Sequence, residues 1–216
     1  MDRSLADVEN RVADHVEAYR ESAPFYPVEA EAIESLSDAF RAGEYGKRDV
    51  EWVVRWYFRR AVTDIDHEER RAVEEAVSDV EPRELRGAMW DAIDALDGEA
   101  GDPSHHHALD ALTGIPGVDA AVASALLWFL DPDAYFVVGE REWAVVAALT
   151  GDSAPGPGPD LDGSYPEPMT VDAYDRYLDA VGGLSDRLDV DHWHLYMVIR
   201  SVYAEAFEGK AVEGES

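Results

Sequence analysis

The chain has 216 residues, 46% of them hydrophobic, including six Trp, ten Tyr and six Phe. This is enough apolar material for a sizeable core, and it excludes a chain that is disordered throughout. The formal net charge of −29 comes from 47 acidic and 18 basic residues. Such a charge repels itself in ordinary salt, whereas multimolar salt shortens the Debye length to about 3 Å or less. The composition therefore predicts a cytoplasmic protein of an extreme halophile.

Several classes of site and location are excluded at this stage. The chain has no Cys, which rules out disulfides, thiolate metal sites, iron–sulfur clusters and a Cys nucleophile. Met1 leads directly into a charged amphipathic segment, so no secretory signal is expected. The longest apolar run, 120–130, is far shorter than the ~20 residues that span a bilayer, so we expect no membrane association. The acidity does not exclude nucleic acid, because proteins adapted to high salt are acidic whatever they bind.

Apolar residues at helical spacing, with Pro and Gly between the periodic segments, predict a series of helices in chain order. The expected helices are 2–20, 27–43, 47–61, a short helix through Val77, a helix opened by Pro82, a helix capped by Ser104 that ends near Thr113, 119–130, 140–149, a helix capped by Thr170, and 191–207. Residues 135–138 are expected to be a short extended piece, 150–169 a Pro/Gly-rich loop and 209–216 a polar tail.

The expected fold class is all-α, because no alternating strand pattern exceeds four residues. The distinctive stretch is 109–130, in which a helix, a turn at Gly114-Ile115-Pro116-Gly117-Val118 and a second helix form a hairpin. Pro116 fixes one turn dihedral, and Gly114 and Gly117 can adopt positive φ angles. Helix 119–130 is expected to be the most buried of the chain.

This stretch resembles the helix-hairpin-helix motif of the DNA glycosylase superfamily. Ile115-Pro116-Gly117-Val118 and Val122-Ala123 match the hairpin, and Val138, Arg141 and Trp143 match a later segment of the family's motif. The resemblance implies two helical lobes within residues 1–208. The middle lobe, about 47–150, would carry the hairpin, and the other lobe would be built from 1–46 and 170–208.

The positions that carry catalysis in the family are changed. Asp119 replaces the second hairpin glycine, Ala121 occupies the position of the catalytic Lys, and Gly139 occupies that of the catalytic Asp. Glu140 is the nearest carboxylate, but a shift of one helical residue turns a side chain by about 100°. Its ordinary role would be to offset the dipole at a helix start. Because it is nevertheless the carboxylate nearest to Gly139, Glu140 is the one candidate catalytic residue.

The resemblance also implies a DNA contact at the hairpin. Backbone amides at its tip and the following helix N-terminus can hold a phosphate, which makes Gly114, Ile115, Gly117, Val118 and Asp119 candidate DNA-binding residues. In the family, hairpin carbonyls also hold a monovalent cation, so a potassium or sodium ion at 114–118 is expected; no other metal or cofactor is expected. Asp119 opposes a phosphate and at the same time suits an N-cap. The alternative is a corner used only for packing.

Segment 47–61 carries a dense cluster of basic and aromatic residues. Trp52 and Trp56 with Arg55, Arg59 and Arg60 could stack bases and hold phosphates. The alternative is that the aromatics are core and that the arginines pair with the acidic residues at 64–69. Arg55 and Arg59 are candidate DNA-binding residues, and the resemblance adds Arg141.

The histidines predict no metal site. His105, His106 and His107 are adjacent at a helix start, so their side chains are expected to diverge and to be solvated. His192 and His194 flank Trp193, and at most one of the two is expected to be interior.

Three functions are consistent with these patterns. The first is a catalytically silent or altered relative of the helix-hairpin-helix glycosylases that binds DNA weakly in a repair-related role. The second is an active glycosylase or lyase that uses Glu140 or another carboxylate. The third is a protein-interaction domain on the same scaffold, with an unknown protein partner.

Overall fold

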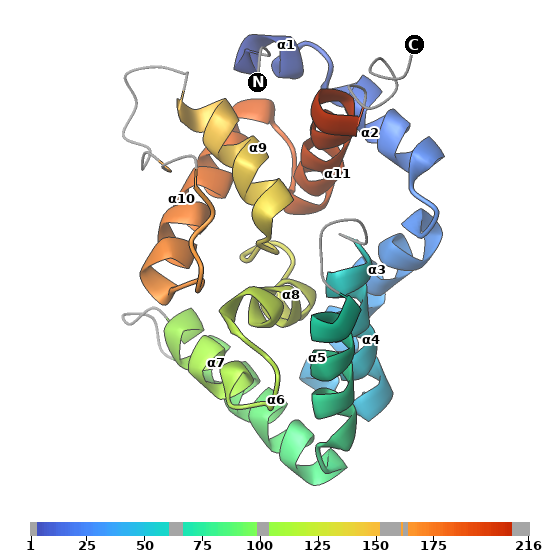
Figure 1. Ribbon diagram of the computed structural model, residues 1–216, viewed down its shortest axis with the longest axis vertical. Helices are drawn as coiled ribbons and strands as arrows, with labels where there is room; N and C mark the ends of the chain where they lie inside the picture. The colour runs from blue at the N-terminus through green and yellow to red at the C-terminus, as the bar shows by residue number, and fades with distance from the viewer. Residues whose placement is uncertain (1–3, 61–66, 99–103, 152–160, 162–163, 209–216) are drawn as a thin grey trace. The chain divides into compact units, whose positions relative to one another are not determined.

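The computed structural model describes residues 4–60, 67–98, 104–151, 161 and 164–208, and within this part of the chain the fold is all-α (Figure 1). It contains eleven α-helices and a π-helical turn, η1. Their bounds are α1 Leu5–Glu9, α2 Val12–Ser22, α3 Tyr26–Ala42, α4 Lys47–Arg59, α5 His67–Asp79, α6 Pro82–Leu96, α7 Ser104–Thr113, α8 Ala120–Leu130, α9 Glu140–Gly151, α10 Val171–Leu188, α11 His192–Tyr203 and η1 Ala204–Glu208. The all-α prediction is confirmed.

The chain divides into two compact units. The central unit comprises 32–137 with 169–171, and the terminal unit comprises 1–31, 138–168 and 172–216. The central unit thus begins inside α3 and ends before α9, whereas the expected middle lobe runs from about 47 to 150. The difference arises because the second half of α3 packs with the central helices, where Ser37 Oγ donates to the carbonyl of Leu130 at 2.8 Å. Helix α9 packs on α11 in the terminal unit.

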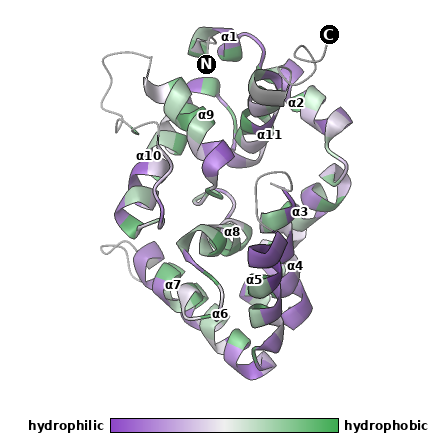
Figure 2. Cartoon of the chain, in the orientation of Figure 1, coloured by the Kyte–Doolittle hydropathy of each residue, from purple (hydrophilic) through white to green (hydrophobic). Residues whose placement is uncertain are grey.

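Helix α8 is the core of the central unit. Residues 121–130 are all buried, and Figure 2 shows the helix as predominantly hydrophobic. It packs against α7 and α4, while α6 packs along α7. The first amides of a helix have no acceptor inside the helix. At the start of α8 the carboxylate of Asp119 supplies one, accepting from the amide of Val122 at 2.8 Å.

An aromatic cluster joins α4 to α8. The ring of Trp56 lies 5.0 Å from that of Phe129 and 5.5 Å from that of Trp128, and Trp52 lies 5.5 Å from Phe129. Arg60 is 8% exposed, with its guanidinium 4.5 Å from the ring centre of Tyr57. Trp56, Tyr57 and Phe58 are therefore core, as the alternative interpretation held, whereas Trp52 is half-buried.

Helix α11 organises the terminal unit by packing against α2 and α9. Asp191 caps it, accepting from the amide of His194 at 2.7 Å. The ring of Trp193 stacks on Tyr196 at 5.8 Å, and that of Trp143 from α9 stacks on Tyr177 from α10 at the same distance. Large aromatic side chains thus supply much of the buried area that holds these helices together.

Local chemistry explains where the helices depart from the prediction. The expected helix 2–20 breaks between α1 and α2, because the Asn10 side chain donates to the carbonyl of Ala6 at 2.8 Å and ends α1 there. Residues 135–138 form no strand. Helix α9 continues to Gly151, two residues beyond its expected end. Most of the expected 150–169 loop and all of the 209–216 tail lie outside the described residues.

Candidate functional site

The α7–α8 turn, residues 114–119, is where the sequence places its hairpin. The amide of Gly114 donates to the carbonyl of Asp110 at 3.2 Å, that of Ile115 to Leu112 at 3.1 Å, and that of Val118 to Ile115 at 3.0 Å. Ile115 and Val118 are 3% and 5% exposed, so their side chains anchor the turn in the core. Three of the amides expected to face a ligand therefore hold the turn together instead.

The backbone conformation of the turn requires a glycine at position 117. Its φ is +83°, in the region that favours glycine, whereas Gly114 has no positive φ. A Cβ built on Gly117 would lie 3.1 Å from the Cβ of Ala76 and 3.3 Å from the Cα of Val73, both in α5. The glycine thus allows close approach of α5 to the turn. Because α5 carries five carboxylates against two arginines, the packing helix brings net negative charge beside the turn.

The end of the turn and the start of α8 still offer backbone donors, of which Gly117 and Asp119 are exposed, Ala120 is half-buried and Ala121 is buried. Within the described part of the chain, no acceptor partners the amides of Gly117, Asp119, Ala120 and Ala121. These amides open a helix whose N-terminus carries a partial positive charge. The Asp119 carboxylate lies among them, because it caps the amide of Val122. The turn therefore combines anion-binding backbone with an anionic side chain.

The basic residues proposed for DNA lie in different settings. Arg55 donates to the carboxylate of Glu51 at 2.6 Å, one turn earlier in α4. Arg59 is exposed on the same helix. Arg141 belongs to the terminal unit, is 8% exposed, and has its guanidinium 5.0 Å from the ring centre of Tyr203. The side chain of Arg141 is thus engaged in the interior of its own unit.

The candidate catalytic carboxylate is solvated. Glu140 is exposed in the first turn of α9, and Gly139 before it is buried. The buried carboxylate of this helix is Glu142, which is 1% exposed and accepts from Arg200 Nη1 at 3.4 Å. Helical spacing could have found it, because Glu142 lies three and seven residues before the buried Val145 and Leu149, on one apolar stripe.

Further buried polar contacts link α2 to α3 and α11. His15 is 1% exposed, and its Nδ1 lies 3.0 Å from the hydroxyl of Ser201. The phenol of Tyr19 donates to the carboxylate of Glu29 at 2.6 Å. Burial, together with the nearby Tyr196 and Glu29, raises the pKa of Tyr19 well above its ordinary value, so the phenol stays protonated and serves as a donor. Sequence reasoning missed the pair His15–Ser201 because its members are 186 residues apart, and it missed Tyr19–Glu29 because the two residues lie on different helices.

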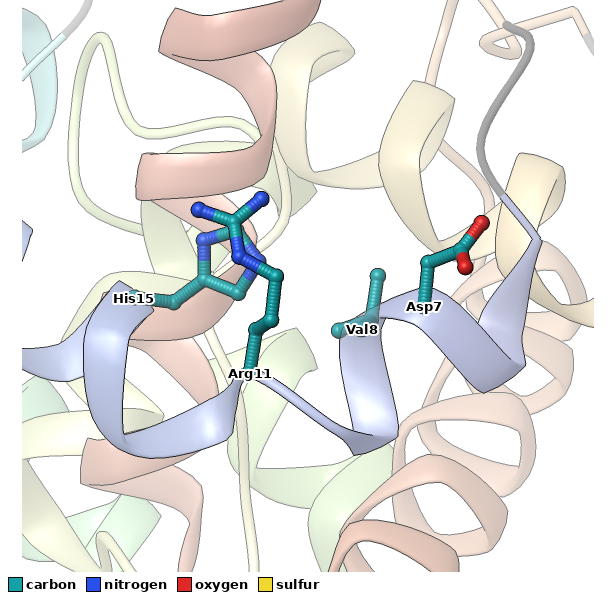
Figure 3. Close-up of a pocket in the computed structure, with 4 residues that line it drawn as sticks. All are labelled: Asp7, Val8, Arg11 and His15. Atoms are coloured by element: carbon teal, nitrogen blue, oxygen red, sulfur yellow. The ribbon is translucent and has the colours of Figure 1, made fainter.

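A cavity of about 260 Å³ opens beside these contacts in the terminal unit. It is lined by Asp7 and Val8 of α1, by Arg11 between the helices, and by His15 of α2 (Figure 3). In this view the side chains of Arg11 and His15 rise on one side of Val8, and the carboxylate of Asp7 lies on the other. The cavity therefore has exposed charged groups of both signs, from Asp7 and Arg11, in its lining.

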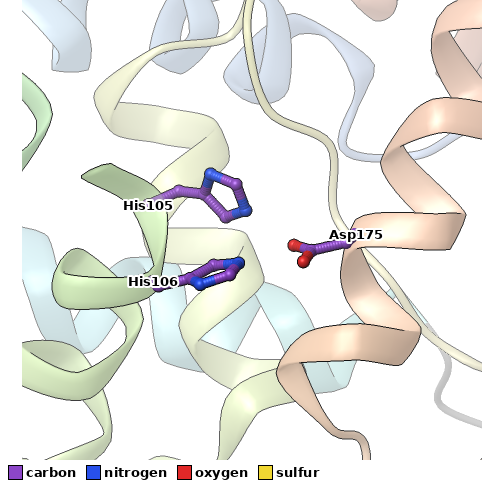
Figure 4. Close-up of side chains that lie close together, drawn as sticks. All are labelled: His105, His106 and Asp175. Carbon is purple, nitrogen blue, oxygen red and sulfur yellow. The ribbon is translucent and has the colours of Figure 1, made fainter. Parts of the chain in front are cut away.

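His105, His106 and His107 are not all solvated, as the sequence analysis expected them to be. His107 is exposed, but His105 and His106 are half-buried and their rings meet edge to face at 4.6 Å (Figure 4). The figure also draws Asp175, which belongs to the terminal unit. His192 and His194 are both half-exposed, and His194 Nδ1 lies 2.7 Å from the carboxylate of its capping residue Asp191.

Compared with protein-family models, with curated proteins and with solved structures, the chain shows no significant match. Across the described residues, no helix is both long enough and apolar enough to cross a membrane. The functional assignment therefore depends on the chemistry of the residues themselves.

Proposed function

We propose that the protein is a non-catalytic relative of the helix-hairpin-helix glycosylases that contacts DNA phosphates, weakly, through the α7–α8 turn. The observation that carries this proposal is the group of unpartnered amides at Gly117 and Asp119–Ala121, at the start of the fully buried helix α8. Backbone amides at a helix N-terminus bind phosphate without any basic side chain. This suits a protein with a net charge of −29.

A monovalent cation at the same turn belongs to the proposal. Backbone carbonyl oxygens are the ligands that a potassium ion takes in proteins. Residues 114–118 supply such oxygens, although the carbonyl of Ile115 already accepts from the amide of Val118. Potassium or sodium bound there would add positive charge beside a phosphate.

The proposed absence of catalysis follows from three positions. Ala121 offers no amine, Gly139 offers no carboxylate, and the side chain of Glu140 is exposed to solvent rather than enclosed in a pocket. We expect no base excision and no borohydride-trapped Schiff base on duplexes that carry damaged bases, assayed in multimolar KCl. Strand nicking by purified protein would contradict this. Its loss in Glu140→Gln would then assign the activity to Glu140 and make the protein an active glycosylase or lyase.

The DNA contact is tested by Asp119→Gly. Removing the carboxylate removes a repulsion of the order of the helix-terminus attraction, ~0.3–1 kcal/mol, so the affinity for undamaged DNA should rise about two- to fivefold. The lost cap should cost only a few tenths of a kcal/mol in stability. Fluorescence anisotropy over a KCl series, with unfolding midpoints measured alongside, gives both values.

Asp191→Gly is the matched control. Asp191 caps α11 as Asp119 caps α8, because each carboxylate accepts from the amide three residues later in the chain. Asp191, however, lies in the terminal unit. This variant should lose at least as much stability, because Asp191 also contacts His194 Nδ1 at 2.7 Å, and leave DNA affinity unchanged. An equal gain in both variants would show a general effect of net charge. An unchanged affinity in Asp119→Gly would show that the turn is only a structural corner.

A protein-interaction domain is the second candidate function. The observations that favour it are the acidic helix packed against Gly117 and two exposed apolar side chains, Phe25 and Val28, each 48% exposed. They lie one helical turn apart, and the amide of Val28 donates to the carbonyl of Phe25. This candidate takes first place if Asp119→Gly leaves DNA affinity unchanged.

A further inference from the structure

We infer that the cavity lined by Asp7, Val8, Arg11 and His15 binds a small zwitterion, a free α-amino acid. The inference is independent of the proposed DNA contact, which lies in the other unit. It rests on the size of the cavity and on the atoms that its lining leaves available.

The size of the cavity limits the ligand. The volume of about 260 Å³ lies below the ~300–1,000 Å³ typical of pockets for drug-sized ligands. Val8 and His15 line the cavity but are 0% and 1% exposed, so the exposed side chains that a ligand meets are those of Asp7 and Arg11. A compact ligand fits these limits.

Arg11 supplies a carboxylate-binding group. Its Nη2 donates to Glu205 at 3.3 Å and its Nε lies 3.7 Å from Asp14. Within the described part of the chain no partner engages Nη1, which leaves that nitrogen to donate to a ligand carboxylate. The two carboxylates already beside Arg11 make a purely anionic ligand unfavourable, because they would repel it.

Asp7 supplies the opposite charge. Its Oδ2 accepts from the amide and the hydroxyl of Ser4, at 3.3 and 2.9 Å, and no described residue engages Oδ1. A ligand ammonium can therefore bind Oδ1 while its carboxylate binds Arg11 on the other side of Val8 (Figure 3). A molecule that carries both charges can pair with both Arg11 and Asp7, whereas a singly charged molecule can pair with only one of them.

Isothermal titration calorimetry of the full chain with L-valine tests the inference, using isobutylamine and isovalerate as probes that lack the carboxylate or the amine. We expect valine to bind and each half-molecule to bind at least tenfold more weakly. Arg11→Gln should weaken valine at least tenfold and abolish its advantage over isobutylamine. Asp7→Asn should abolish its advantage over isovalerate. Perturbation of the His15 ring resonances by valine would locate the ligand.

Arg20→Gln is the matched control, because Arg20 lies on α2, is similarly exposed and pairs with a helix neighbour, Glu17. It should bind valine as the wild type does, and circular dichroism should show that every variant is folded. The absence of heat and of His15 shifts with valine, or undiminished binding in Arg11→Gln, would overturn the inference. DNA affinity should be the same with and without valine, so either proposal can fail alone.

Discussion

The thermal unfolding midpoint should rise by about 10–20 °C between 0.1 M and multimolar KCl. The 47 acidic residues outnumber the basic residues by 29, and they occur along the whole chain rather than in one tail. At 0.1 M salt the Debye length of ~10 Å lets neighbouring surface carboxylates repel one another, whereas at 1 M it is ~3 Å. If screening recovers roughly 5 kcal/mol, a sizeable part of a domain's stability, the midpoint shifts by this amount at ~2–4 °C per kcal/mol.

Two controls isolate screening from other effects of concentrated solutes. NaCl should match KCl, because a Debye effect depends on ionic strength and not on the identity of the cation. Sucrose at equal osmolality in low salt should give a smaller rise, since it acts by exclusion from the protein surface and screens nothing. Equal midpoints in low and high KCl would remove the argument for adaptation to high salt.

The helices that could be predicted are those whose signals are local. Pro82 opens α6 at its first position and Asp119 caps α8, each as its position in the sequence predicts. Asp191, expected as the first residue of the last helix, is the residue that caps it. The end of α7 at Thr113 and the complete burial of α8 were also predictable, because the residues that determine them are adjacent in the chain. Caps and apolar periodicity act within one or two turns and need no tertiary context.

The features that could not be predicted depend on contacts between distant segments. Glu142 meets Arg200, and His15 meets Ser201, across 58 and 186 residues of sequence. The boundary of the units inside α3 likewise depends on which helices pack together, which periodicity does not specify. For the same reason the dense cluster of Arg and Trp in 47–61 resembled a nucleic-acid surface, although Trp56 is buried against Phe129.

Gly117 shows how one residue supports two interpretations. A glycine in a turn indicates close approach of some backbone, and the sequence suggested a ligand. In the structure the approaching backbone is that of α5, with the Cα of Val73 3.3 Å and its carbonyl oxygen 3.4 Å from a Cβ built on Gly117. The packing role therefore accounts for this glycine without DNA, whereas the amides of Gly117 and Asp119–Ala121 remain the basis of the proposed phosphate contact.

Gly117→Ala should reduce the free energy of unfolding by about 2–5 kcal/mol. An L residue at φ +83° costs ~1–2 kcal/mol, and the added methyl group meets helix α5 at distances that force it to move, which typically costs a further ~1–3 kcal/mol. Gly87→Ala is the matched control, because a Cβ there meets nothing within 4 Å in the interior of α6. That substitution should stabilise the protein by about 0.5–1 kcal/mol. Urea unfolding in multimolar KCl measures both.

A double-mutant cycle with Ala76→Gly separates backbone strain from packing. Ala76 supplies the nearest contact, at 3.1 Å, so its removal should recover the part of the packing cost due to that methyl group and leave the parts due to φ and to the Val73 backbone. Coupling of about 1 kcal/mol or more between the two sites would show that α5 packs on the turn in solution. Additive effects would place α5 elsewhere and leave this side of Gly117 open. The DNA affinity of the folded Gly117→Ala protein can then be interpreted. It should fall below that of the wild type only if DNA contacts the backbone of the turn and not α5.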